Sequence, residues 1–143
     1  MAMQKTTGIE KSVKSTAAIT TAFTIAQFGA DDNTLSLATA STQELIGVFQ
    51  HTTAAAGAEV RVMLSGITEL KIGGTVTRGN LITSDASGQG VAATQHTHTE
   101  NTAASYTQNA VTVAASAVRV IGKALASGVS GDIIPVLLVQ GIV

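Results

Sequence analysis

The side chains of this protein that could do chemistry are few, and the most suggestive lie in the stretch HTHTE. His96, His98 and Glu100 alternate with threonines, so they would share one face of an extended segment. Two imidazoles and a carboxylate can hold Zn²⁺ or a similar ion. The surrounding segment is rich in threonine and has no apolar periodicity, which favours a solvated loop. We therefore predict no metal and no cofactor, and keep His96 and His98 as the alternative metal ligands.

Two further patterns could carry chemistry. The stretch GQGVAA, which begins at Gly88, has the form G-x-G-x-x-A, but a dinucleotide site needs such glycines to open a helix after a strand. Here they follow Asp85 in a pattern typical of a hairpin turn. Asp31 and Asp32 could be paired carboxylates for acid–base work, but with Asn33 they favour a turn. We find no catalytic residues and predict that the protein is not an enzyme.

The composition of the chain excludes several classes of partner. Among 143 residues only 12% are charged, the net charge is −1, and the Lys and Arg residues are dispersed. Binding to nucleic acid through its phosphates needs focused cations, so a nucleic-acid partner is not expected. No apolar run approaches the roughly 18–20 residues that span a bilayer, so a membrane partner is not expected either. Hydrophobic residues make up 45% but aromatics only 3%, so the core must be built from Val, Ile, Leu and Ala.

Short alternating segments predict a mainly β fold. Residues 59–65, EVRVMLS, alternate with period two, as a half-buried strand does. Residues 81–94 contain a turn signal between two apolar stretches and predict a hairpin. Residues 110–126 are alanine-rich, which suits a helix, but their valines at spacing two favour strands. Weaker strand signals lie at residues 19–25, 34–37, 44–50 and 68–74.

These elements predict one small β-barrel or sandwich of short antiparallel strands and hairpins, with an extended N-terminal arm. We place the arm at residues 1–22 and the β domain at residues 23–143, with a loop insertion at about residues 94–110. Lys5, Lys11 and Lys14 are dispersed along the arm among Thr, Ser and Ala. The arm is either a plain disordered tail or a segment that becomes ordered on a large partner, where its lysines would bind.

The chain also repeats itself. The stretch LIGVFQHTTAAAGAEVRVMLSGI, from Leu45, aligns with VIGKALASGVSGDIIPVLLVQGI, from Val120. Gly47 then matches Gly122, and Gly57 matches Gly131 after a gap of one residue. Each copy reads as a strand, a turn of small residues and a second strand. Two copies are too few for a solenoid, so two related hairpins within one β domain are expected.

The alignment exposes a difference between the outward faces of the two hairpins. In the first copy the expected outward residues are mostly polar, and they are Glu59, Arg61, Met63 and Ser65. Their counterparts in the second copy are all apolar, and they are Ile133, Pro135, Leu137 and Val139. Pro135 cannot donate a ladder hydrogen bond, so we expect a free edge there. Full burial of each such apolar side chain stabilises a protein by about 1.5–3 kcal/mol, so an apolar strip is expected to be covered rather than left in water. We therefore expect a subunit contact, or cover by the arm, at Ile133, Leu137 and Val139.

Three stretches resemble a known family. They are FGADDNTLSLATASTQELIGVFQHTTAAAGAEVRVMLSG, GNLITSDASGQGVAAT and VRVIGKALASGVSGDIIPVLL, and they resemble the capsid decoration, or cement, proteins of tailed phages. The resemblance covers about residues 28–143 apart from the HTHTE loop, which looks like an insertion. Asn80, Lys123 and Ser127 depart from the residues common in the family. The resemblance implies a β-rich homotrimer that binds the major capsid protein on the outer capsid surface, without catalysis.

Residues and resemblance together predict a non-enzymatic virion structural protein. It would bind the outer surface of a phage capsid and stabilise the expanded head by bridging major capsid protein subunits. The alternative is a tail, spike or fibre module that binds a host receptor. A metal-dependent enzyme that uses His96 and His98 is a third, weaker hypothesis.

Overall fold

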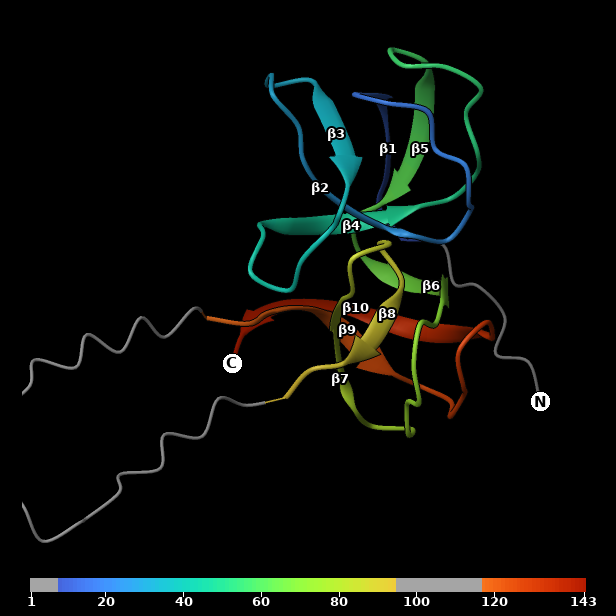
Figure 1. Ribbon diagram of the computed structural model, residues 1–143, viewed down its shortest axis with the longest axis vertical. Coiled ribbons are helices and arrows are strands. Elements are labelled where there is room, and N and C mark those ends of the chain that lie inside the picture. The colour runs from blue at the N-terminus through green and yellow to red at the C-terminus, as the bar shows by residue number, and fades with distance from the viewer. Residues whose placement is uncertain (1–7, 95–116) are drawn as a thin grey trace, which may run out of the picture.

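The computed structural model describes residues 8–94 and 117–143, and these form ten β-strands and no helix (Figure 1). Among them, accordingly, no helix is long and apolar enough to cross a membrane. The strands are β1 (Glu10–Ser15), β2 (Ile25–Phe28), β3 (Thr34–Leu37), β4 (Leu45–Phe49), β5 (Glu59–Met63), β6 (Gly66–Lys71), β7 (Leu81–Ser84), β8 (Gly90–Ala92), β9 (Arg119–Ala124) and β10 (Ile133–Ile142).

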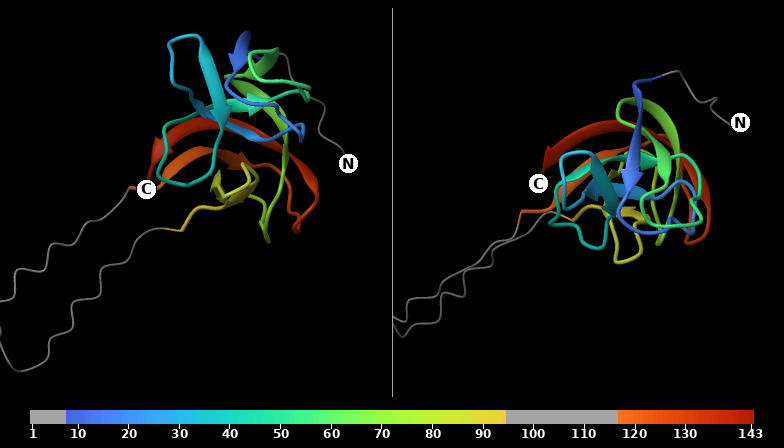
Figure 2. Two further views of the ribbon diagram at one scale, coloured as in Figure 1. Left: turned by 45° about the horizontal axis from the view of Figure 1, so that its top comes forward. Right: turned by 90° about the horizontal axis from the view of Figure 1, so that it is seen from above.

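The strands build two layers. β1 to β5 close a barrel in the order β1-β3-β2-β4-β5, and β6 to β10 form a second sheet in the order β6-β10-β9-β7-β8. The second sheet curves beneath the barrel (Figures 1 and 2). A parallel bridge between Ile72 and Gly90 brings its two edges together. The predicted fold class is confirmed, since all strand pairs are antiparallel within the described residues except the short pair β1–β3.

At the end where they pair with each other, strands β4 and β5 are buried on both faces, because there they stand between the interior of the barrel and the second sheet. Phe49 and Val62 pack inside the barrel. Val48 and Met63, each one residue away, pack in the core shared with the second sheet. All four side chains are 0% exposed. The prediction that Met63 faces outward is therefore wrong, because residues of the second sheet pack against it.

The hairpin predicted at residues 81–94 is present as β7 and β8. In its turn, Asp85 Oδ1 accepts hydrogen bonds from the N–H groups of Ser87 at 2.8 Å and Gln89 at 2.9 Å. Gly88 takes a φ of +71°, which a side chain would strain. The turn also joins the two layers, because the Ile25 N–H donates to the Gly88 carbonyl at 2.7 Å.

The structure differs from the expected N-terminal arm over residues 10–15, which form β1 of the barrel. β1 pairs with β5 along five residues, and Val13 packs against the barrel core. Ile19, also within the expected arm, is 2% exposed in the same core. The single apolar residue between polar neighbours in this stretch was too weak a pattern to predict a strand.

The free edge expected at Pro135 is wrong, because β10 lies between β6 and β9. The Ile72 N–H bonds to the Asp132 carbonyl, so alternate residues of β10, Pro135 among them, direct their backbone groups away from β6. On that side β9 has already ended at Ala124, and the Leu125 N–H donates to the Pro135 carbonyl at 3.0 Å. The missing N–H of the proline therefore interrupts no regular part of the ladder.

Candidate binding surfaces

The outward face of β10 carries a strip of exposed apolar side chains. Ile133 is 51% exposed, Leu137 37% and Val139 52%, while the alternate residues Ile134, Val136 and Leu138 point into the core. Residues directly opposite each other in a sheet share a face. Leu137 lies opposite both Ile67 of β6 and Lys123 of β9, and Lys123 lies opposite Leu81 of β7, itself 37% exposed. The strip thus continues across the sheet, and we call this surface the β10 face.

Charged residues border the β10 face. Lys71 lies opposite Ile133 and Glu69 lies opposite Pro135, both on β6. The face therefore combines an apolar centre with charges of both signs, a composition common where proteins meet. The residues 8–22 of the expected arm leave Ile133, Leu137 and Val139 exposed, so the described part of the arm does not cover the strip. A subunit contact there stays a prediction.

A second candidate surface surrounds the two arm lysines that the structure describes. Lys11 and Lys14 are exposed on β1, whereas Lys5 lies outside the described residues. A hollow of about 280 Å³ runs beside the strand and is lined by Lys11, Ser12, Val13, Lys14, Asn33 and Glu59. Two cations and a strand edge therefore border one groove, which we call the β1 groove.

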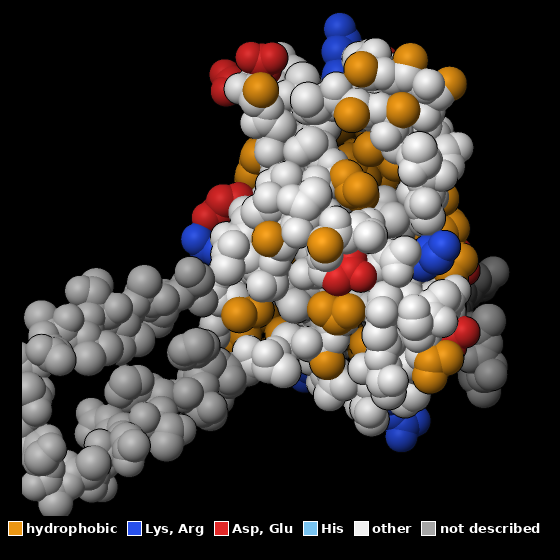
Figure 3. Space-filling model, in the orientation of Figure 1, with side chains coloured by type: hydrophobic (Ala, Val, Ile, Leu, Met, Phe, Trp, Pro, Cys, Tyr) orange, Lys and Arg blue, Asp and Glu red, His pale blue; other side chains and the backbone are white. Residues whose placement is uncertain are grey.

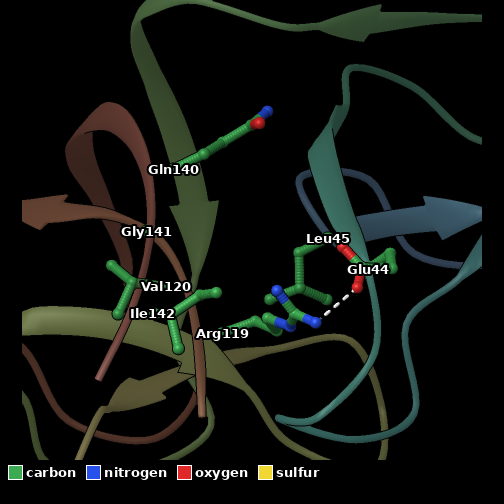
Figure 4. Close-up of a pocket in the computed structure, with 7 residues that line it drawn as sticks. All are labelled: Glu44, Leu45, Arg119, Val120, Gln140, Gly141 and Ile142. Carbon is green, nitrogen blue, oxygen red and sulfur yellow. Dashed lines mark ion pairs between the residues drawn. The ribbon is translucent and has the colours of Figure 1, made fainter. Parts of the chain in front are cut away.

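A third hollow, of about 250 Å³, lies between the two layers (Figure 4). An ion pair crosses it, with Arg119 Nη2 at 2.5 Å from Glu44 Oε1. The Arg119 N–H also donates to the Ser41 carbonyl at 2.7 Å, and Gln140 Nε2 donates to the Ile46 carbonyl at 2.9 Å. These bonds fasten the second sheet to the β4 side of the barrel. The sequence carried no signal for this contact, because the two charged residues lie far apart in the chain and meet only in the fold.

Arg119 has a further property in this hollow. Its Nε is buried and has no hydrogen-bond partner among the described residues. Because that atom is enclosed, a ligand in the hollow could not reach it. We therefore interpret the Arg119–Glu44 contact as a structural link between the layers.

The structure supports no catalytic or metal-binding role for the described residues that the sequence offered for such chemistry. His96, His98 and Glu100 lie outside the described residues, which contain no group of three or more His, Cys, Asp or Glu that could hold a metal ion. Gly88 and Gly90 belong to a turn and to a strand, so GQGVAA does not open a helix. Asp31 forms a turn, as predicted, in which its carbonyl accepts from the N–H and the hydroxyl of Thr34 at 3.0 Å.

The remaining histidine has a structural role. The Nε2 atom of His51 accepts a hydrogen bond from the Arg61 N–H at 3.1 Å. The proton must then sit on Nδ1, which lies 3.0 Å from the Thr52 carbonyl and donates to it.

Figure 3 shows one face of the molecule, on which apolar side chains are scattered over both layers among few charged ones.

Comparison with known proteins gives a likeness of fold. The sequence matches no protein-family model and no curated protein. The structure is similar to the crystal structure of the N base of head fiber gp8.5 in bacteriophage phi29, with a TM-score of 0.61. The likeness covers 92% of this chain and 93% of that chain at 10% sequence identity. At this identity the likeness shows the fold, and it extends over both layers.

Proposed function

We propose that the protein is a non-enzymatic structural component of a phage virion. In this proposal it binds the outer surface of the capsid and stabilises the expanded head by bridging major capsid protein subunits. The observation that carries the proposal is the likeness of fold, over 92% of the chain, to the base of a phage head fiber. The resemblance of three sequence stretches to phage decoration proteins, noted above, supports the same class independently.

The physical mechanism is linkage. A protein that binds the assembled shell, but not its separated subunits, lowers the free energy of the shell by mass action. Three linked copies would convert weak single contacts into firm attachment, because the second and third contacts form intramolecularly. We assign the β10 face to the contact between copies in a homotrimer, since its apolar centre would otherwise stay in water. The β1 groove then remains for the capsid.

Locating the protein on virions tests the proposal. Antibodies against it, labelled with gold, should decorate the heads of the phage whose genome encodes it. Labels confined to tails or to fibre tips would overturn the capsid proposal in favour of the alternative, a tail, spike or fibre module that binds a host receptor. Purified protein should also raise the temperature at which expanded heads lacking it break open, and an unchanged temperature would contradict the stabilising role.

A deletion tests the arm, and the fold decides where it must stop. Removing residues 2–20 would take β1 and Ile19 out of the barrel, so lost binding would report misfolding. Removing residues 2–7 leaves every described strand in place. If Lys5 and its neighbours contact the capsid, this shorter chain should sediment with heads less completely than the full chain. Equal sedimentation would remove the claim for Lys5.

A further inference from the structure

The strand β1 has one edge whose hydrogen-bonding groups are not all used. Along one of its two edges β1 pairs with β5, and in this pairing Ser12 lies opposite Arg61. The backbone groups of Arg61 point the other way, because its N–H donates to His51 Nε2 and its carbonyl accepts from the Gln50 N–H at 2.9 Å. Ser12 and Arg61 are therefore a non-hydrogen-bonded pair, and the N–H and carbonyl of Ser12 point away from β5.

The opposite neighbour of β1 does not reach Ser12. β3 pairs with β1 only at Lys14 and Ser15, and the Lys14 N–H donates to the Asn33 carbonyl at 3.2 Å. Among the described residues, no partner is found for the N–H or carbonyl of Ser12. The β1 groove, of about 280 Å³, lies along this stretch. Unpaired strand groups beside a groove form a template on which another extended segment can pair.

Lys11 lies on the part of β1 that precedes the pairing with β3. It lies opposite Val62, whose side chain is 0% exposed inside the barrel, so Lys11 stands on the inward face of β1. Even so, Lys11 is exposed to solvent. This exposure fits the short β1–β3 pairing, which begins only at Lys14, and a lysine side chain can also extend its ammonium group into solvent at the rim of a barrel. A chain segment could therefore reach both Ser12 and Lys11 from the same side.

We propose that the edge of β1 at Ser12 binds an extended segment of another protein by strand addition, with an acidic side chain of that segment directed at Lys11. The inference rests on the proposed function for the identity of the partner, which would be a capsid segment. The backbone of Ser12 supplies one donor and one acceptor, which give affinity without sequence preference. Lys11 supplies the preference for a carboxylate.

The charges around the groove single out Lys11 over Lys14. Lys14 lies opposite Glu59, which lines the same groove, so the field of that carboxylate offsets the charge of Lys14 for an incoming anion. Glu10 lies near Arg61, at 3.9 Å between Oε2 and Nη1. Lys11 faces the uncharged Val62 across the ladder. An acidic residue of the added strand therefore gains more on the side of Lys11 than on the side of Lys14.

A proline at position 12 tests strand addition. Ser12→Pro removes the outward N–H but no bond to β5, and an edge position tolerates proline. Ser12→Ala keeps the N–H and is the matched control. The proline variant should bind expanded heads about tenfold or more weaker, because it loses a backbone bond and blocks the edge, while the alanine variant should bind as the natural chain does. Equal binding by both variants would overturn strand addition at this edge.

The lysines test the preference for an acidic segment. Lys11→Gln should weaken head binding several-fold and flatten its dependence on salt, whereas Lys14→Gln should change both much less. The reverse order would overturn the assignment of Lys11. Amide hydrogen exchange of the natural chain gives a measurement that needs no variant: the Ser12 amide should exchange fast in the free protein and slowly on heads. Fast exchange on heads would contradict the proposal even if both variants misfolded.

A peptide separates this inference from the proposed function. If the protein does not bind heads, the capsid role fails, and the groove is then probed with the capped peptide Thr-Val-Glu-Val-Thr and its Lys-for-Glu control. The acidic peptide should shift the NMR signal of the Ser12 amide and slow its exchange, and the basic peptide should do so at least tenfold more weakly. Absence of any shift, or equal shifts from both, would overturn the groove as a site for an acidic strand. If the Lys11→Gln variant associates with itself and the peptide does not bind, the role of Lys11 is to prevent β1 from pairing with a second copy of the chain. That result would also overturn the proposal.

Discussion

Gly47 of β4 and Gly122 of β9 occupy the same position in two copies of one hairpin. A Cβ on Gly47 would lie 2.4 Å from the Met63 carbonyl oxygen and 2.6 Å from Val62 Cγ1. A Cβ on Gly122 would lie 2.4 Å from the Leu137 carbonyl oxygen and 2.7 Å from Val136 Cγ1. The strand registers agree as well: the pairs Val48–Met63 and Phe49–Val62 of the first copy correspond to Lys123–Leu137 and Ala124–Val136 of the second.

Alanine at either glycine should destabilise the protein. The added methyl group would meet a carbonyl oxygen of the paired strand, which cannot move without disturbing the ladder, so Gly47→Ala and Gly122→Ala should each cost about 1–3 kcal/mol of unfolding free energy. Gly141→Ala is the matched control, because no atom lies within 4 Å of a Cβ there. Urea unfolding measures all three. A neutral effect at both Gly47 and Gly122 would contradict the close approach of the strands.

The repeat was readable in the sequence because it rests on local contacts. A glycine needed for close packing and a second glycine in the turn recur whenever the same hairpin is built, and both glycine pairs match in the structure. The burial of Met63 was not readable, because it depends on a second sheet whose position no local pattern encodes. The interior position of Pro135 was not readable either, because it depends on β6 and β9 pairing with the two edges of β10. The outward direction of the strip on β10 followed from alternation alone, whereas the groove at Ser12 requires the strand order.

Met63 should behave as a core residue of both layers. Met63→Ala removes a side chain that is 0% exposed, and we expect a loss of about 2–5 kcal/mol in unfolding free energy. Arg61→Ala, two residues earlier on the same strand, should cost far less because its side chain is 59% exposed. Denaturant unfolding of both variants, followed by circular dichroism, makes the comparison. Similar losses would mean that the two layers do not share a core at this strand.

The turn glycines of the repeat should discriminate between substituents. Gly57 has a φ of +78° and Gly131 a φ of +93°, and a Cβ at either would meet no atom within 4 Å. The penalty for a side chain is therefore conformational, and Gly131→Ala should cost about 1–2 kcal/mol. Gly131→Asn should cost less, since asparagine adopts this conformation more readily. If alanine and asparagine were equivalent in thermal unfolding, backbone strain would not be the cause.

The ion pair between Arg119 and Glu44 should contribute modestly. The Glu44 side chain is 64% exposed, so water and salt screen the pair, and Glu44→Gln should cost at most about 1 kcal/mol. The cost should shrink further in 1 M NaCl, where screening acts within about 3 Å. Thermal unfolding at low and high salt measures both. A loss that persists at high salt would indicate that the glutamate acts through packing rather than through its charge.

The β10 face provides the sharpest prediction about assembly. The triple change Ile133→Thr, Leu137→Thr and Val139→Thr puts β-branched side chains, which favour strands, on a face that is exposed in the single chain. The stability of one copy should therefore change little, whereas association should be lost, because the apolar area buried between copies is what would hold them together. Light scattering at micromolar concentration should report three copies for the natural chain and one for the variant. A matched triple change on the opposite side of the strand, at Ile134, Val136 and Leu138, should instead unfold the protein, since these side chains are buried. If the natural chain is a monomer at this concentration, the homotrimer is ruled out. If the natural chain associates and the triple threonine variant associates equally well, the contact between copies lies outside the β10 face.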